Sequence, residues 1–237
     1  MNRKLILSIG LALARLTSAD VHADAFRNLG FEAAAQHPLD PDQSDYYLRV
    51  PITNALPFWQ GFINGTEQTN VFYTTFTLGA PALQLLSATN GGRVLKGNFS
   101  LWLHSTPMSS VSISQVGDVP LDAQSIRFLG SVGYFGPPLR LDELFGVFVN
   151  NEQLPVLDLS FDGPYHTYGA DVSQFAGQNV DLRFTALNVN YTEGLIMDSI
   201  SFSAEPVPEP STLALWALAG CSVPRILRLR RKGAGST

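Results

Sequence analysis

The stretch NVDLRFTAL, residues 179–187, alternates apolar and polar side chains along its length. Val180, Leu182 and Phe184 are apolar, and the residues between them are Asp, Arg and Thr. A period of two is typical of a β-strand with one face in a core and the other in water. This stretch therefore predicts a half-buried strand.

Six further runs between residues 26 and 203 are short, rich in apolar residues, and bounded by Gly, Pro, Asn or Asp. They are 70–78, 98–105, 125–132, 143–150, 154–161 and 195–203. No comparable helical stripe accompanies them. An antiparallel sheet must cover its apolar face with another layer. The sequence therefore predicts an all-β fold, an antiparallel two-sheet β-sandwich over residues 26–203, with a tight hairpin at Asn150 and Asn151.

Residues 1–25 have the pattern of a signal peptide: a basic start, a short apolar stretch over 5–14 and a small-residue cleavage site. The alternative, a buried N-terminal helix, is disfavoured by Arg15, which follows the apolar part directly. We expect export through the Sec translocon.

Charge and cysteine content restrict the partners of the exported body. Between residues 25 and 209, seven Lys/Arg stand against eighteen Asp/Glu, a net charge of −11. This charge argues against nucleic acid and anionic lipid as partners, because neutralising their phosphates requires clustered Lys and Arg. Divalent cations and neutral sugars remain compatible. The single cysteine, Cys221, lies in the C-terminal tail, so the body has neither a disulfide nor a thiol nucleophile.

The C-terminal stretch VPEPSTLALWALAGCSVPRILRLRRK, residues 207–232, follows a proline-rich spacer at 204–210. It resembles the PEP-CTERM sorting signal, which in that family is processed by the membrane enzyme exosortase. The resemblance implies a recognition motif, a hydrophobic transmembrane helix and a basic stop. The motif residues are Pro208, Glu209, Pro210, Ser211 and Thr212, and the basic stop is Arg225, Arg228, Arg230, Arg231 and Lys232. The apolar run 213–223 is short for a membrane span, and Pro224 interrupts it.

The body resembles galactose-binding-like jelly rolls in three stretches: NLGFE, YGADVSQFAGQNVDLRFTA and GLIMDSISFS. In such folds a Glu near the first strand and an Asp in the last help to hold a structural calcium ion. This resemblance assigns those positions to Glu32 and Asp198. Asp198 shares its parity with Ile196 and Ile200, which predicts a buried carboxylate. The alternative is that Asp198 accepts backbone N–H bonds at an edge or bulge. No cofactor is required by either interpretation.

Aromatic residues near loops provide candidate sugar contacts, since rings stack on the C–H faces of sugars. They are Trp59, Trp102, Tyr134, Tyr165 and Tyr168. The alternative for each is a place in the core.

Catalytic and zinc-binding patterns are not recognisable. The segment 157–171 contains Asp158, Asp162, His166 and Asp171, and the pair Asp142 and Glu143 lies before it, but no known spacing connects them. The remaining histidines are scattered, which argues against zinc. The sequence predicts that the protein is not an enzyme.

Together these patterns predict an exported, non-catalytic protein that passes through an inner-membrane intermediate to the cell envelope or extracellular matrix. Exosortase would process its tail, and extracellular polysaccharide or biofilm would be its setting. The alternatives are a carbohydrate-binding module that recognises extracellular glycans and, less favoured, a glycan hydrolase.

Overall fold

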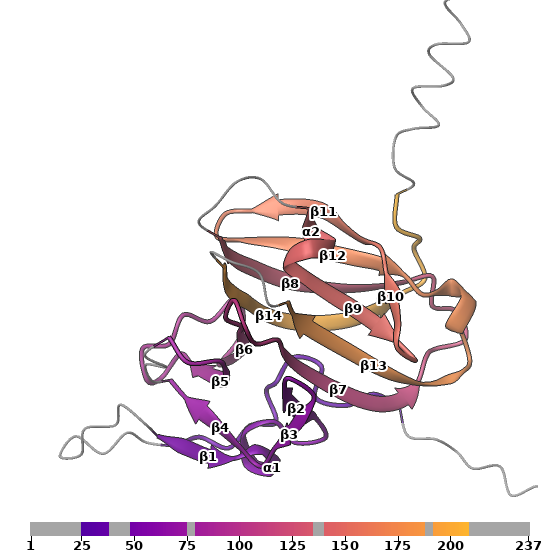
Figure 1. Cartoon of the computed structure of the whole chain (residues 1–237). Helices are drawn as coiled ribbons and strands as arrows, with labels where there is room; N and C mark the ends of the chain where they lie inside the picture. Colours follow the sequence, from indigo (N-terminus) through magenta and orange to yellow (C-terminus); the bar gives the residue numbers. More distant parts are fainter. Residues whose placement is uncertain (1–24, 38–47, 75–78, 135–139, 188–191, 209–237) are drawn as a thin grey trace, which may run out of the picture.

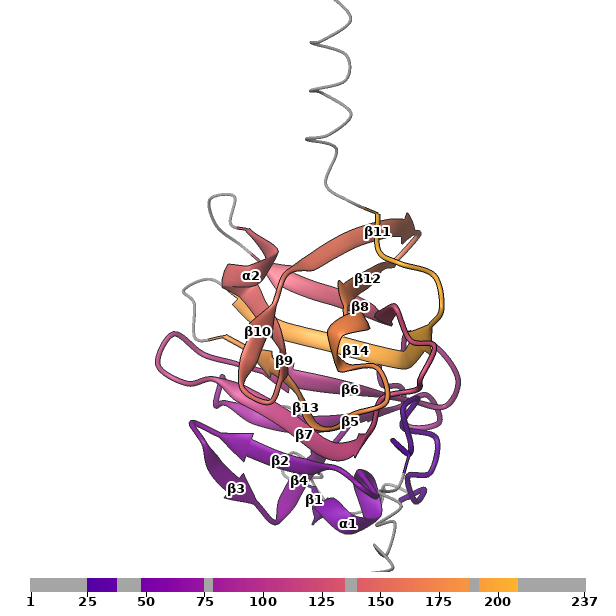
Figure 2. The same cartoon turned by 90° about the vertical axis from the view of Figure 1, so that its right-hand side faces the viewer.

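The computed structural model describes residues 25–37, 48–74, 79–134, 140–187 and 192–208. Its strands form two sheets, which Figures 1 and 2 show as layers, with β14 and β8 in one and β13 and β9 in the other. All neighbouring strands are antiparallel except β4 and β5. The predicted all-β, two-sheet sandwich is confirmed.

The eight-stranded sheet has the order β1 (Arg49–Pro51), β4 (Asn70–Tyr73), β5 (Ala82–Ser87), β6 (Phe99–His104), β14 (Thr192–Ser203), β8 (Ser125–Tyr134), β12 (Tyr165–Asp171), β11 (Val156–Asp162). The six-stranded sheet has the order β10 (Glu152–Leu154), β9 (Phe145–Val149), β13 (Asn179–Ala186), β7 (Val111–Asp118), β2 (Gln60–Ile63), β3 (Thr66–Gln68). Three single turns of helix complete the described part: α1 (Ile52–Ala55), α2 (Leu141–Leu144) and the 3-10 turn η1 (Ser173–Phe175).

The core lies between the sheets, and β13 provides its centre. Val180, Leu182 and Phe184 are all buried, as the alternation of 179–187 predicts. The Phe184 ring contacts Phe128 from the opposite sheet at 5.3 Å between centroids, and Trp59 at 6.4 Å. Each such side chain stabilises the fold by about 1.5–3 kcal/mol through burial alone. The stability of the sandwich therefore rests on the inner faces of the two sheets.

The last strand, β14, departs from the predicted regular alternation. Leu195 and Met197 are fully buried, whereas Ile196 is half-buried on the opposite face. The pairing with β8 shifts register between Asp198 and Ser201, and Ser199 has φ +49°. An extra residue at such a bulge reverses which face the following residues occupy. The predicted common face for Ile196 and Ile200 is therefore wrong, because the strand is not regular.

The predicted hairpin at residues 150–151 is confirmed. Asn150 and Asn151 have φ +50° and +67°, and they connect β9 to β10 with Val149 opposite Glu152. Asparagine tolerates this left-handed region better than most residues.

Residues 1–24 of the predicted signal peptide, the motif residues beyond Pro208, the apolar helix and the basic stop lie outside the described residues. Within the described ranges, no helix is long and apolar enough to cross a membrane.

Candidate functional site

Glu32 and Asp198 both bind the loop 95–100, which precedes and begins β6. The Glu32 carboxylate accepts the backbone N–H of Asn98 at 2.8 Å and of Phe99 at 3.1 Å. It also accepts the Asn98 side-chain amide at 3.0 Å. The resemblance that paired Glu32 with Asp198 thus identified two residues that the fold brings to one loop.

Asp198 is buried, and both of its oxygens already accept two donors. Ser100 Oγ–H and Lys96 N–H donate to one oxygen, at 2.7 Å and 3.1 Å, and Ser199 donates to the other from its N–H and its hydroxyl. Burial raises the pKa of Asp198 above its ordinary value, and these donors partly oppose that rise. The arrangement is the predicted alternative, a carboxylate that accepts backbone N–H bonds at a bulge.

Calcium at Glu32 and Asp198 stays an untested prediction. Four donors occupy the lone pairs of Asp198, which leaves that carboxylate poorly suited to a metal ion in this arrangement. Among the described residues, no three His, Cys, Asp or Glu side chains gather in a way that could hold a metal.

Of the five aromatic residues predicted as sugar contacts, the four whose side chains are described do not form one platform. Trp59 and Tyr168 are 4% and 3% exposed, so their prediction as contacts is wrong, because both rings fill the core. Trp102 and Tyr165 are half-buried, but they lie on β6 and β12, and β14 and β8 separate these strands. The side chain of Tyr134 falls outside the described part.

The hairpin of β11 and β12 brings together two polar residues that are eight positions apart. Its turn contains Gly163 at φ +65°, and it places Phe161 opposite His166. A register shift between Asp158 and Ser160 then leaves Asp158 beside the same imidazole. His166 Nδ1 lies 2.7 Å from Asp158 Oδ2. The side chains of His166 and Asp158 are 35% and 41% exposed, so water and small solutes reach this pair.

A row of rings extends from this pair into the core. The centroid of Phe161 lies 4.6 Å from that of His166, and His166 stacks on Tyr168 at 5.6 Å with planes 8° apart. Tyr168 then contacts Phe145 of the other sheet at 5.0 Å. Phe161, at the outer end of the row, is 65% exposed. A large apolar ring thus stands in solvent beside an oriented imidazole.

Tyr168 forms the buried wall of this site. Burial, together with the negative charge of Asp158, raises the pKa of Tyr168 to about 12. Its ring lies over Gly130, where a Cβ would come within 2.7 Å of the Tyr168 ring. Gly130 therefore provides the space in which Tyr168 supports His166.

The contact with Asp158 uses Nδ1 of His166 and leaves Nε2, which is an acceptor in the corresponding neutral tautomer. With Asp158 as acceptor, the neutral imidazole carries its proton on Nδ1 and presents the Nε2 lone pair. In the described part of the chain, His166 has no second hydrogen-bond partner. We call Asp158, Phe161, His166 and Tyr168 the hairpin site. It can accept a hydrogen bond at Nε2 while a flat molecule packs against Phe161.

Asp158 and His166 were candidates from the sequence but were not paired, because the prediction treated the strands as regular. The Asp-Gly-Pro turn at 162–164 was the signal that could have paired them. Three of the other acidic candidates have structural roles: Asp171 accepts the N–H of Ser173, and Asp142 and Glu143 bind Arg140.

No protein-family model matches the chain, and no curated protein matches it significantly. Among solved structures, a similar chain is a cyclase from Fischerella sp. TAU, crystallised in complex with 4-(1H-indol-3-yl)butan-2-one. The two chains are 16% identical with a TM-score of 0.42, and the match covers 79% of this chain and 99% of the cyclase.

The functional prediction is corrected by this finding. The sequence predicted an exported, non-catalytic envelope or matrix protein sorted for exopolysaccharide, whereas the solved protein found is a cyclase. That prediction and its glycan-directed alternatives are not carried further. At this similarity the match assigns no reaction to the chain.

Proposed function

We propose that the sandwich is a small-molecule-binding domain, and that its ligand is a flat ring compound with one N–H or O–H donor. The observation that carries the proposal is the hairpin site, where the exposed Phe161 ring lies 4.6 Å from the oriented His166 imidazole. The ligand ring would pack on Phe161, and its donor would bind His166 Nε2. The proposal is for binding without turnover.

The charge of the molecule narrows the ligand class. The body carries a net charge of −11, and Asp158 is part of the site itself. An anionic ligand would be repelled by both, so the ligand is neutral or cationic. One stacked ring contributes about 0.5–1.5 kcal/mol beyond its buried area, and one neutral hydrogen bond about the same. A single-ring fragment should therefore bind with a dissociation constant on the order of 1 mM.

Phenol and anisole are matched probes for this site, because anisole keeps the ring and replaces the O–H by a methyl ether. We expect phenol to shift the NMR resonances of the His166 imidazole, and anisole to bind roughly five- to tenfold more weakly, the equivalent of one lost hydrogen bond. Equal affinities would contradict the role of His166.

Two variants locate the binding. Phe161→Ala should abolish measurable phenol binding, because the stacking surface is lost. Phe58→Ala is the matched control: Phe58 is also a solvent-facing ring, 56% exposed, and it packs under Arg27 away from the hairpin site. Equal effects of the two changes would show that phenol binds exposed rings in general, and would refute the proposal.

We also propose that the chain is exported, on the basis of the signal-peptide pattern in residues 1–25. The intact mass of the protein purified from its native host tests this. Loss of the first 23 or 25 residues is expected, and retention of Met1 and its neighbours would contradict export by this route.

A further inference from the structure

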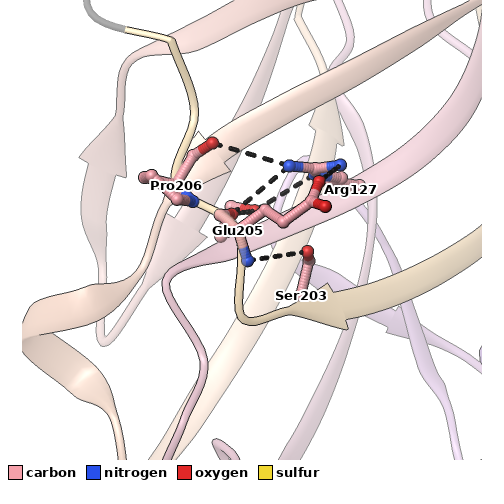
Figure 3. Close-up of polar contacts among 5 residues, drawn as sticks. Arg127, Ser203, Glu205 and Pro206 are labelled. Atoms are coloured by element: carbon pink, nitrogen blue, oxygen red, sulfur yellow. Dashed lines mark hydrogen bonds and ion pairs between the residues drawn. The ribbon is translucent and has the colours of Figure 1, made fainter.

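The chain does not leave the sandwich where β14 ends at Ser203. Figure 3 shows Glu205 and Pro206 lying against Arg127 of β8. Arg127 donates from Nη1 to the Glu205 carboxylate at 3.1 Å, and from Nη2 to the carbonyl oxygens of Glu205 at 3.3 Å and Pro206 at 3.5 Å. One guanidinium therefore binds three oxygens of the departing segment.

Two serines add to these contacts. Ser125 Oγ–H donates to the Glu205 carbonyl at 2.7 Å, and the Glu205 N–H donates to Ser203 Oγ at 3.1 Å. Ser125 is fully buried, and Arg127 Nε donates to its hydroxyl at 3.2 Å. The segment thus meets two linked donors on β8, Ser125 and Arg127.

Val207 supplies an apolar contact on the neighbouring strand. Gly169 of β12 lies opposite Arg127 in the sheet. A Cβ at Gly169 would come within 3.2 Å of Val207 Cγ1 and 2.7 Å of Leu159 Cδ1. The absent side chain at Gly169 therefore leaves the space that Val207 and Leu159 fill.

We propose that Ser125, Arg127 and Gly169 form a recognition site for a proline-containing extended segment, and that its occupant is Glu205-Pro206-Val207 of the same chain. We call this the strap site. The planar fork of Arg127 suits several oxygen acceptors at once. Pro206 restricts the segment to an extended conformation, so less entropy is lost when it binds.

The backbone carbonyls carry this recognition more than the ion pair does. The Glu205 side chain is 79% exposed, and an exposed ion pair contributes little. The carbonyl bonds instead depend on the path of the segment itself. The first residues of the predicted spacer 204–210, up to Val207, are therefore part of the folded body.

Backbone order in the full-length chain tests the strap site. In 15N-labelled protein, the amide order parameters of Glu205 and Val207 should be close to those of the sheet, about 0.85. Arg127→Gln should lower both below about 0.6, the range of flexible backbone. Arg49→Gln is the matched control, because Arg49 packs over Phe72 at 4.5 Å on another strand and should leave both values unchanged.

Two further variants separate the contributions. Glu205→Gln should leave the segment ordered, because the carbonyl bonds remain. Val207→Asp should release the segment while leaving every residue of the sheet unchanged. It therefore tests the strap site even if Arg127→Gln fails to fold. Flexible Glu205 and Val207 amides in the unaltered chain, or unchanged order in both Arg127→Gln and Val207→Asp, would overturn the proposal.

Discussion

Replacing Asp198 with alanine should destabilise the sandwich more than replacing Glu32, the other carboxylate that binds the loop 95–100. Asp198 is 1% exposed, and its carboxylate is the acceptor for Ser100 Oγ–H and Lys96 N–H. Each donor left without an acceptor in the interior costs about 1–3 kcal/mol. Removing the Asp198 carboxylate also removes the free-energy cost of burying it, which offsets part of this loss. We expect the free energy of unfolding to fall by about 3 kcal/mol.

Urea unfolding followed by tryptophan fluorescence measures this loss. Glu32→Ala is the matched control, because Glu32 binds the same loop but is exposed, so water can replace it. It should cost about 1 kcal/mol or less. In the Asp198→Ala background, Ser100→Ala should cost less than it does alone, since its acceptor is already absent. A loss below about 1 kcal/mol for Asp198→Ala would refute the reasoning.

The same residue gives a pH dependence of defined sign. Burial raises the pKa of Asp198 above its ordinary value of 3.8, so the folded chain keeps this proton to a higher pH than the unfolded chain does. Its contribution to stability is therefore full below pH 3.8 and falls as pH rises through the folded-state pKa. Asp198→Asn lacks this titration. The stability advantage of the unaltered chain over Asp198→Asn should shrink over that window, and an advantage that grows would contradict the raised pKa.

Three further predictions concern Tyr168, Gly194 and calcium. Because the pKa of Tyr168 is raised to about 12, the free energy of unfolding should fall between pH 10 and 12 by at most about 2 kcal/mol. Urea unfolding of Tyr168→Phe should show no such fall, and an identical fall in the variant would contradict the raised pKa. Gly194→Ala should lower stability by about 2 kcal/mol or more, because φ is +89° and a Cβ would meet the Leu103 carbonyl oxygen. Gly65→Ala, at φ +75° in open space, should cost only about 1 kcal/mol, so equal losses would refute the clash. Treatment with EDTA should leave the Tm unchanged, because the oxygens of the Asp198 carboxylate already accept four hydrogen bonds. A Tm that rises when calcium is added back would instead establish a structural calcium ion.

The strand at 179–187 was predictable from its alternation, whereas the strand β5 was not. Residues 179–187 alternate because β13 separates core from solvent, so its pattern is visible without the fold. β5, at Ala82–Ser87, is buried at every position, including Gln84 and Ser87, and therefore shows no alternation. The segment 143–150 was predicted as one strand but begins with the helical turn α2.

The hairpin site could not be predicted from the sequence, because it depends on strand pairing that local patterns do not show. Asp158 and His166 were recognisable as candidate groups, but their contact depends on the irregular register of β11 against β12. A one-residue shift sends a side chain to the other face of a sheet. The bulge at Ser199 likewise separates Ile200 from the face of Ile196, with which it was predicted to share one face.

The sequence by itself determined the fold class and the local turns, because strand periodicity and the left-handed tolerance of asparagine are properties of neighbouring residues. The relation between Glu32 and Asp198 came from the resemblance to galactose-binding-like jelly rolls. Only the tertiary structure determined that His166 meets Asp158 beside an exposed Phe161, and that Arg127 binds Glu205 and Pro206. Those contacts join separate segments, and their geometry depends on strand register and sheet order, which no local pattern of residues encodes.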